Sequence, residues 1–258
     1  MYLDKIVAHK QLEIAELKQK TSIDELRQSE FYNRKCYSLK ANLLSSNSGI
    51  ISEFKRRSPS KGFIKEGAQV ANIVPGYEQS GASGISVLAD NEFFAGSPAD
   101  VCEARSLVKT PILFKEFVID EFQIHLAKAS GADVVLLIAA ILTPTQVKQF
   151  AQVAHSLGLE TLLELHSPAE VGHICTEVDL VGINNRNLKT FEVDLQASID
   201  LCHQIPDSFV KVSESGISNP QTVKELRAQG FRGFLMGENF MKTEQPAQTL
   251  KEFIENLK

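Results

Sequence analysis

Short apolar runs rich in Val, Ile and Leu alternate with longer amphipathic stretches along this chain of 258 residues, once the first 45 residues have passed. Each run except the last is separated from the next by enough chain for one helix. This alternation is typical of β-α units arranged around a parallel sheet. The runs number eight and cover Ile50–Lys55, Gly84–Ala89, Pro111–Lys115, Asp133–Ala139, Glu160–His166, Asp179–Asn184, Phe209–Ser213 and Gly233–Met236.

Eight strand-helix units are the number that closes a (β/α)8 TIM barrel. A doubly wound sheet usually has fewer strands and a G-x-G-x-x-G turn after its first strand, whereas Arg56-Arg57-Ser58-Pro59-Ser60 follows the first run here. Linkers, low-complexity tracts and internal repeats do not divide the sequence. We therefore expect an α/β fold, one TIM-barrel domain over residues 1–258, in which residues 1–45 form a helical extension that caps the barrel.

The extension itself is predicted to be helical. Its apolar residues recur at helical spacing, and a second helix is expected around Ser22–Glu30. A lid over one barrel end is the favoured role, because the barrel alone can cover the apolar face; a partner-binding helix is the alternative. The residues that define the first helix are Leu3, Ile6, Val7, Ile14 and Leu17.

Composition excludes several functional classes. The chain is 43% apolar and 23% charged, with a formal net charge of −5, which disfavours nucleic acid or an anionic membrane as a partner. The N-terminus is charged where a signal peptide is apolar, and the longest apolar stretch, Val134–Leu142, is too short to cross a bilayer. The four cysteines form no C-x-x-C pair. We expect a cytoplasmic protein with reduced thiols.

Polar residues end several of the apolar runs, which is where a TIM barrel carries its active site. In the first run, Glu53 and Lys55 share one face by period-two alternation, and Phe54 points the opposite way toward the helices. Burying many charges around one cavity costs several kcal/mol per ion unless a ligand or mutual pairing compensates, so a catalytic cluster is favoured over solvated strand ends. The other members are Lys115, Glu164, Asn184 and Arg186.

The last two runs end in glycine-containing segments, Ser213-Glu214-Ser215-Gly216-Ile217 and Leu235-Met236-Gly237-Glu238-Asn239. Glycines let backbone N–H groups approach an anion, and the loops after barrel strands seven and eight are a recurrent phosphate site. A phosphorylated small molecule is the expected ligand. The six histidines show no H-E-x-x-H spacing, so no metal is expected, and His166 is interpreted as a rim or structural residue. The basic run Lys55-Arg56-Arg57 with Lys61 is too short for a nucleic-acid patch.

Residues 50–62, IISEFKRRSPSKG, resemble the signature of the indole-3-glycerol-phosphate synthase family. The resemblance covers nearly the whole chain. At strand eight this chain has Gly237-Glu238 where some members have Gly-Ser, so only backbone donation to a phosphate is expected there. The further matching segments are LDKI (3–6), FFAGS (93–97), LFKEF (113–117), LELH (163–166), GINNRNL (182–188) and SESGI (213–217).

The resemblance implies a cofactor-free carboxy-lyase of tryptophan biosynthesis. Its reaction closes the ring of 1-(2-carboxyphenylamino)-1-deoxyribulose 5-phosphate to indole-3-glycerol phosphate, with loss of carbon dioxide and water. By resemblance, Lys115 is the general acid at the carbonyl oxygen, Glu164 is the base and Lys55 is a second cation or acid. The division of acid roles between the two lysines stays open.

The resemblance also assigns substrate contacts. Glu53 and Asn184 would hold sugar hydroxyls, Arg186 would pair with a substrate group, and Glu214 would position a lysine. The phosphate would lie against Ser58, Ser215, Gly216 and Gly237 with Glu238 beside it, and the aromatic ring against Pro59, Phe94 and Phe117.

Alternatives within the same fold are a phosphate-sugar isomerase and an aldolase in which Lys115 forms a Schiff base. A non-enzymatic phosphate sensor is disfavoured, because Lys55, Lys115 and Glu164 are all present. Oligomeric state and association with other tryptophan-pathway enzymes are not determined by the sequence.

Overall fold

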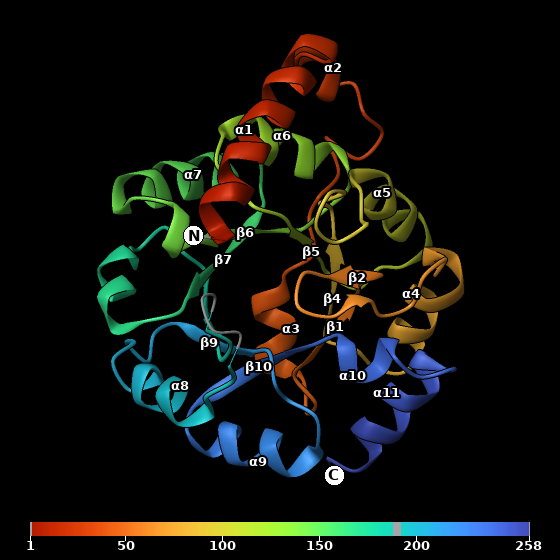
Figure 1. Ribbon diagram of the computed structural model, residues 1–258, viewed down its shortest axis with the longest axis vertical. Helices are drawn as coiled ribbons and strands as arrows, with labels where there is room; N and C mark the ends of the chain where they lie inside the picture. The colour runs from red at the N-terminus through yellow and green to blue at the C-terminus, as the bar shows by residue number, and fades with distance from the viewer. Residues whose placement is uncertain (1, 188–191, 258) are drawn as a thin grey trace.

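The computed structural model describes residues 2–187 and 192–257, in which eight parallel strands form a closed barrel (Figure 1). Leu188, the last residue of the segment GINNRNL, lies outside the described residues. The strands follow one another around the ring in sequence order, and β1 closes it by pairing with β4 and β10. They are β1 (Ile50–Phe54), β4 (Gly84–Leu88), β5 (Ile112–Lys115), β6 (Val134–Ile138), β7 (Glu160–Leu165), β8 (Leu180–Asn184), β9 (Val210–Glu214) and β10 (Phe231–Met236).

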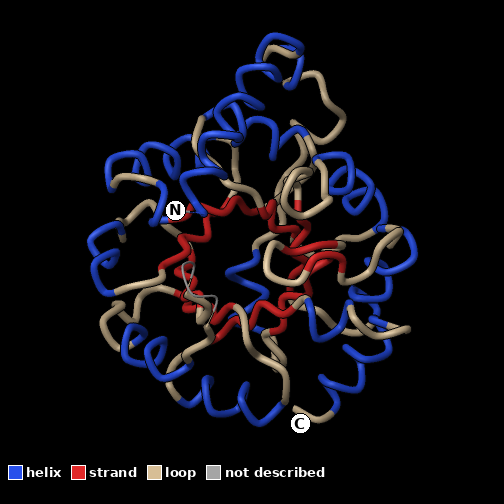
Figure 2. Tube along the Cα trace, viewed as in Figure 1, coloured by secondary structure: helices blue, strands red, loops and turns tan. Residues whose placement is uncertain are grey.

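Helices surround the ring of strands (Figure 2). The unit after β7 departs from the pattern, because a short 3-10 helix, η2 (Pro168–His173), stands in place of an α-helix. A second 3-10 turn, η1 (Ala139–Ile141), follows β6, and a two-stranded hairpin of β2 (Arg57–Ser58) and β3 (Gly62–Phe63) follows β1. The α-helices after the strands are α4 (Val70–Gln79), α5 (Pro98–Leu107), α6 (Glu121–Ala129), α7 (Pro144–Ser156), α8 (Leu195–Cys202), α9 (Pro220–Ala228), α10 (Glu238–Met241) and α11 (Pro246–Glu255).

The predicted TIM barrel is confirmed, and each predicted apolar run contains or overlaps one of these strands. The largest boundary difference is at β10, which begins at Phe231 rather than Gly233. Alternation also sets the two faces of the strands as expected. Phe54, for example, packs in the cluster between the strands and the outer helices, whereas Ile51 packs inside the barrel.

Inside the barrel an apolar layer of side chains is followed, toward the C-terminal ends of the strands, by a charged layer. Ile51, Leu113, Leu162 and Val212 belong to the interior apolar cluster. Successive inward positions along a strand are two residues apart, so the next inward position on each strand lies nearer its C-terminal end. Those positions are Glu53, Lys115, Glu164 and Glu214.

The N-terminal extension contains α1 (Tyr2–Lys20), α2 (Ile23–Leu26) and α3 (Leu39–Ser45). The helix expected around Ser22–Glu30 is only the four residues of α2, capped at Ser22 by a capping box. The third helix was not predicted. It lies in the middle of the ring of strands in Figure 1 and closes the N-terminal end of the barrel.

Leucines of α3 fill this end of the barrel. Leu39 and Leu43 are each 1% exposed and pack in the interior cluster. The strands make room with glycines: a Cβ on Gly84 would lie 2.5 Å from Leu39 Cδ1, and a Cβ on Gly233 would lie 3.0 Å from Leu43 Cδ1. The N-terminal end of the barrel is therefore closed by α3, which belongs to the extension of residues 1–45.

Helix α1 is held at the opposite end of the barrel by a buried ion cluster. Lys10 Nζ lies 2.8 Å from Asp90 Oδ2 and 3.0 Å from Glu116 Oε2, residues that follow β4 and β5, and 2.7 Å from Glu13 Oε2. Lys10 is 1% exposed and Asp90 is completely buried. Burial and the charge of Asp90 raise the pKa of Glu116 to about 7, although Lys10 opposes the rise.

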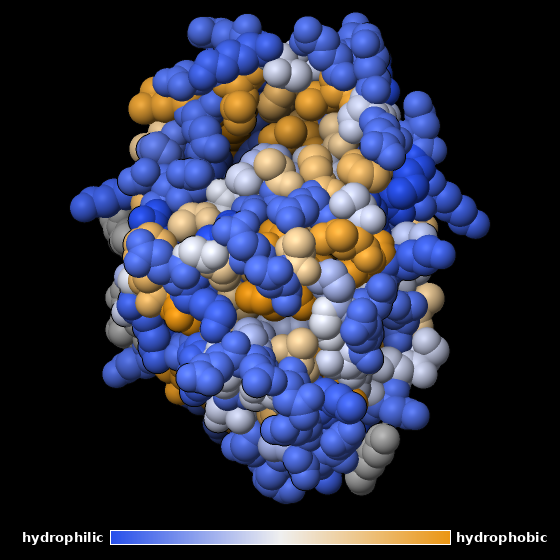
Figure 3. Space-filling model, turned by 90° about the vertical axis from the view of Figure 1, so that its right-hand side faces the viewer, coloured by the Kyte–Doolittle hydropathy of each residue, from blue (hydrophilic) through white to orange (hydrophobic). Residues whose placement is uncertain are grey.

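Figure 3 shows the side of the molecule on which α4, α5 and α11 lie, where hydrophilic residues surround patches of apolar ones. None of the helices within residues 2–187 and 192–257 combines the length and the hydropathy that a bilayer-spanning segment requires.

Replacing Lys10 by Met should destabilise the protein by about 3–5 kcal/mol, because two buried carboxylates lose their cation. Chemical unfolding at neutral pH measures this. Lys18→Met is the matched control on the same helix, since its 2.7 Å ion pair with Asp120 is partly exposed and should be worth less than about 1 kcal/mol. Equal effects of the two substitutions would contradict a special role for Lys10.

Candidate active site

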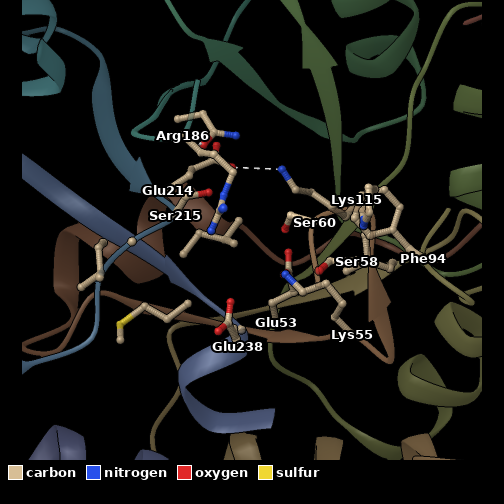
Figure 4. A pocket seen from close by; sticks show the side chains of 18 of the residues that line it. Glu53, Lys55, Ser58, Ser60, Phe94, Lys115, Arg186, Glu214, Ser215 and Glu238 are labelled. Atoms are coloured by element: carbon tan, nitrogen blue, oxygen red, sulfur yellow. Dashed lines mark hydrogen bonds and ion pairs between the residues drawn. The ribbon is translucent and has the colours of Figure 1, made fainter. Parts of the chain in front are cut away.

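One cavity of about 360 Å³ opens at the C-terminal ends of the strands, a size within the usual range for small-molecule sites. Figure 4 shows Lys115, Glu214, Glu53 and Glu238 around this opening. Every site residue predicted from the sequence lines it: Glu53, Lys55, Ser58, Pro59, Phe94, Lys115, Phe117, Glu164, Asn184, Arg186, Glu214, Ser215, Gly216, Gly237 and Glu238.

Lys115 is the central cation of the cavity. Its Nζ lies 2.7 Å from Glu164 Oε2 and 3.0 Å from Glu214 Oε2, so it joins the ends of β5, β7 and β9. Burial alone lowers the pKa of this lysine. The nearby carboxylates of Glu164, Glu214 and Glu53 outweigh burial and raise the pKa well above its ordinary value. Lys115 is therefore an ammonium ion at neutral pH.

The two carboxylates on Lys115 are shifted in opposite directions. Burial raises the pKa of Glu164, but Lys115 and His166 more than reverse this and hold the pKa well below its ordinary value. Glu214 is also buried, and the charge of Glu164 adds to burial, so its pKa is raised despite Lys115. Two neighbouring carboxyl groups with pKa values driven apart are a recurrent feature of acid-base sites.

A second ion pair lies across the cavity at the end of β1. Lys55 Nζ donates to Glu53 Oε1 at 2.5 Å, which agrees with the shared face predicted for these two residues. Ser86 Oγ donates to Glu53 Oε2 at 3.4 Å. Gly237 packs against the same carboxylate, since a Cβ there would lie 2.7 Å from Glu53 Oε1.

The end of β8 connects the acid-base residues to the loop beyond. Asn184 Nδ2 donates to Glu164 Oε1 at 3.2 Å, and Asn184 Oδ1 accepts from the backbone N–H of Arg186 at 3.0 Å. The buried Asn185 Nδ2 donates to the carbonyl of Ser215 at 2.7 Å and so fixes the loop after β9.

Left-handed backbone shapes that loop. Ser215 has φ of 69° and Gly216 has φ of 72°, a conformation that glycine adopts at little cost. A Cβ on Gly216 would lie 2.3 Å from Val193 Cγ1, so this position has no room for a side chain. This loop follows the seventh barrel strand, where TIM barrels often bind a phosphate group.

Three features of the cavity were not recognised in the sequence. Gly182 leaves room for Glu214, because a Cβ there would lie 2.2 Å from Glu214 Oε1; a lone glycine inside an apolar strand is the available signal. Apolar side chains line part of the cavity alongside Phe94 and Phe117, whose ring centroids are 6.0 Å apart. These are Leu88, Leu136 and Ile138.

The third feature is an ion pair at the mouth. Lys61 Nζ donates to Glu238 Oε1 at 2.7 Å and so joins the hairpin after β1 to the start of α10. Burial raises the pKa of Glu238, but Lys61, Lys55 and Arg186 together lower it. Glu238 is therefore a carboxylate at the edge of the glycine loops.

Arg56, in the basic run after β1, is bound to other residues of the chain. Arg56 makes two hydrogen bonds to the carboxylate of Asp100, at 2.7 and 2.8 Å, and its guanidinium lies 4.9 Å from the ring centroid of Phe54.

Within the described residues, no group of three or more His, Cys, Asp or Glu side chains is placed to hold a metal ion.

A closed (β/α)8 barrel with charged side chains and glycine loops gathered at the C-terminal ends of its strands is the construction of a TIM-barrel enzyme. A sequence model of the family described as indole-3-glycerol phosphate synthase matches residues 3–253. The chain belongs to the indole-3-glycerol phosphate synthase family, carboxy-lyases of tryptophan biosynthesis.

Individual relatives agree with this. The chain is 52% identical over 252 residues to the indole-3-glycerol phosphate synthase of Bacteroides thetaiotaomicron, covering 98% of this chain and 97% of that one. It is 39% identical over 260 residues to the enzyme of the same name from Polynucleobacter asymbioticus, covering 97% of each.

Solved structures of lower identity share the fold. A thiamine phosphate pyrophosphorylase from Pyrococcus furiosus superposes with a TM-score of 0.60 at 17% identity, covering 83% of this chain and 98% of that one. A mutant tryptophan synthase α-subunit from the same organism gives 0.61 at 19% identity, covering 81% and 97%. At such identity these similarities show the barrel and nothing about the chemistry.

The raised pKa of Glu214 makes stability depend on pH. A carboxyl group whose pKa is higher in the folded than in the unfolded state stabilises the fold fully below pH 4.5, and this contribution is lost as pH rises through about 7. Glu214→Gln should therefore flatten the fall in unfolding free energy over this range, by at most about 3 kcal/mol. Urea unfolding at several pH values measures the slopes, with exposed Glu255→Gln as the control. Parallel curves for the wild type and Glu214→Gln would refute the expectation.

Proposed function

We propose that the chain closes the indole ring of indole-3-glycerol phosphate from 1-(2-carboxyphenylamino)-1-deoxyribulose 5-phosphate, with Lys115 as the general acid and Glu164 as the base. The observation that carries this proposal is the position of the Lys115 ammonium group between two carboxylates beside the apolar wall of Phe94 and Phe117. An acid, a base and an apolar slot for an aromatic ring then share one cavity.

Ring closure requires an aromatic carbon to attack a ketone, and negative charge develops on the ketone oxygen. An ammonium ion fixed in a largely buried site stabilises that charge and supplies a proton. Lys115 is 15% exposed on its side chain and is held by ion pairs from two other strands. Loss of carbon dioxide from the attacking ring carbon then restores the aromaticity of the six-membered ring, because the electron pair of the broken bond returns to it. Dehydration of the ring-closed alcohol completes the indole.

Dehydration requires an acid for the departing hydroxyl group and a base for a proton. Glu164 is ionised and borders the cavity, which suits the base. Lys55 lies on the other side of the cavity with Glu53 and is the second cation available for the departing hydroxyl group. Glu53 and Asn184 are suited to hold sugar hydroxyls, because each presents a polar side chain to the cavity.

The substrate phosphate is proposed to lie against the left-handed turn at Ser215 and Gly216, with Gly237 and Ser58 nearby and Arg186 as a neighbouring cation. The loops after barrel strands seven and eight are a recurrent phosphate site, because glycines there let backbone N–H groups approach the anion. Pro59, Phe94 and Phe117 would receive the anthranilate ring at the opposite side.

A Schiff-base aldolase on the same barrel is less well supported. Schiff-base formation requires a neutral amine, and enzymes obtain one by lowering the pKa of the lysine. The pKa of Lys115 is instead raised by its carboxylate neighbours. A Lys115 adduct trapped by borohydride in the presence of substrate would favour the aldolase.

Lys115→Ala and Glu164→Gln should each lower kcat by about 10²–10⁴-fold, the usual contribution of general acid-base catalysis. Formation of the indole product is followed by its fluorescence. Lys115→Ala should stay folded, because Glu164 and Glu214 can share a proton when their cation is lost, and circular dichroism checks this. Exposed Lys109→Ala is the control. Normal turnover by either site variant would overturn the assigned roles.

Glu238 should weaken phosphate binding, because its carboxylate repels an anion at the glycine loops. Glu238→Ser removes the charge and adds a hydroxyl donor, and should lower KM for the substrate about fivefold to tenfold. Glu238→Gln removes the charge alone and should give a smaller decrease. Competitive inhibition by inorganic phosphate provides a second measurement. An unchanged KM in both variants would place the phosphate elsewhere.

A further inference from the structure

His166 lies two residues beyond Glu164 at the end of β7, and its side chain is 9% exposed. Its Nε2 is 3.0 Å from Glu164 Oε1 and its Nδ1 is 3.7 Å from Glu170 Oε2. Neither ring nitrogen makes an aligned hydrogen bond to another described residue, so the ring is held by charge contacts. The described residues that line the cavity do not include His166, which places it behind Glu164.

Glu170 is fixed beside this ring by the turn of η2. Its Oε2 accepts from the backbone N–H of His166 at 2.7 Å, and its Oε1 accepts from Ser167 Oγ at 3.2 Å. The imidazole therefore has a carboxylate near each nitrogen. Burial lowers the pKa of His166, but the contacts with Glu164 and Glu170 outweigh it and raise the pKa to about 9. The ring is an imidazolium at neutral pH.

The carboxylate of Glu164 has different partners on its two oxygens. Oε1 lies 3.0 Å from His166 Nε2 and accepts a hydrogen bond from Asn184 Nδ2 at 3.2 Å. Of these three groups, only Lys115 contacts Oε2, to which its Nζ donates at 2.7 Å. With Oε1 occupied from behind and from the side, the plane of the carboxylate is fixed and Oε2 is directed toward Lys115 and the cavity.

We propose that His166 is a positioning residue for the synthase reaction: anchored by Glu170, it holds Glu164 Oε1 and so directs Oε2 at the reacting groups. The proposal rests on the role of Glu164 as the base. His166 does not touch substrate in this arrangement and acts only through Glu164. The charges that face the ring are Glu164 on β7 and Glu170 on η2, with Lys115 on β5 beyond Glu164.

His166→Gln tests whether the charge is required, because glutamine keeps an N–H donor without the charge. We expect kcat to fall about tenfold while KM changes less than twofold, the pattern of an interaction used in the transition state. The wild-type rate should decline above pH 9 as His166 loses its proton, and the variant should lack this decline. A wild-type kcat and pH profile in His166→Gln would overturn the proposal.

Glu170→Gln tests the anchor. Removing one of the two carboxylates should lower the pKa of His166, so the alkaline decline should move to lower pH, and kcat below the decline should fall less than in His166→Gln. An unmoved decline would count against the proposal. His155→Gln is the matched control, because His155 Nε2 also contacts a carboxylate, Asp179 Oδ2 at 2.8 Å, but far from the cavity; it should alter neither kcat nor the pH profile.

The titration of His166 is also measurable by NMR in the ligand-free protein, which separates two failures. A resonance that titrates near pH 9 and shifts in Glu170→Gln, in a protein without synthase activity, would leave the charge arrangement standing and refute the proposed function. Synthase activity with a histidine that titrates at its ordinary pKa would refute the role of His166 and leave the function intact.

Discussion

The ammonium group of Lys115 is the charge on which the arrangement of the site depends. Glu164 and Glu214 end two strands that are separated around the barrel only by β8, and both are buried. Without a cation between them, at least one would take up a proton at neutral pH. Lys115 joins the two carboxylates and is itself kept charged by them, so acid and base are maintained in one cavity by the same contacts.

The rest of the barrel holds these charged groups at one level along the barrel axis. Because inward positions recur every two residues, an apolar layer at Ile51, Leu113, Leu162 and Val212 places the charged residues immediately above it. Leucines of α3 close the barrel from below and exclude water from that layer. The cavity thus has an apolar floor, which strengthens the ion pairs at its edge by lowering the local dielectric.

Much of this could be predicted from the sequence, because it depends on local regularities. Strand alternation gave the barrel, the opposite faces of Glu53 and Phe54, and a set of polar residues that all line one cavity. The features that were missed depend on contacts between distant segments. Helix α3 has only seven residues, too few for a clear period, and its role is visible only when Gly84 and Gly233 lie against it. The surroundings of His166 likewise required the η2 turn, which replaces an expected helix.

The ion cluster at Lys10 also constrains the order of folding during synthesis. Lys10 and Glu116 are separated by 106 residues. At about 5–20 residues per second, roughly 5–20 s pass between the synthesis of Lys10 and that of Glu116, so α1 cannot dock within that interval. During that interval the lysine remains hydrated and α1 has no docking site on β4 and β5. The N-terminal helix, although made first, therefore cannot reach its final position before the loops after β4 and β5 have been made, and its docking depends on that side of the barrel.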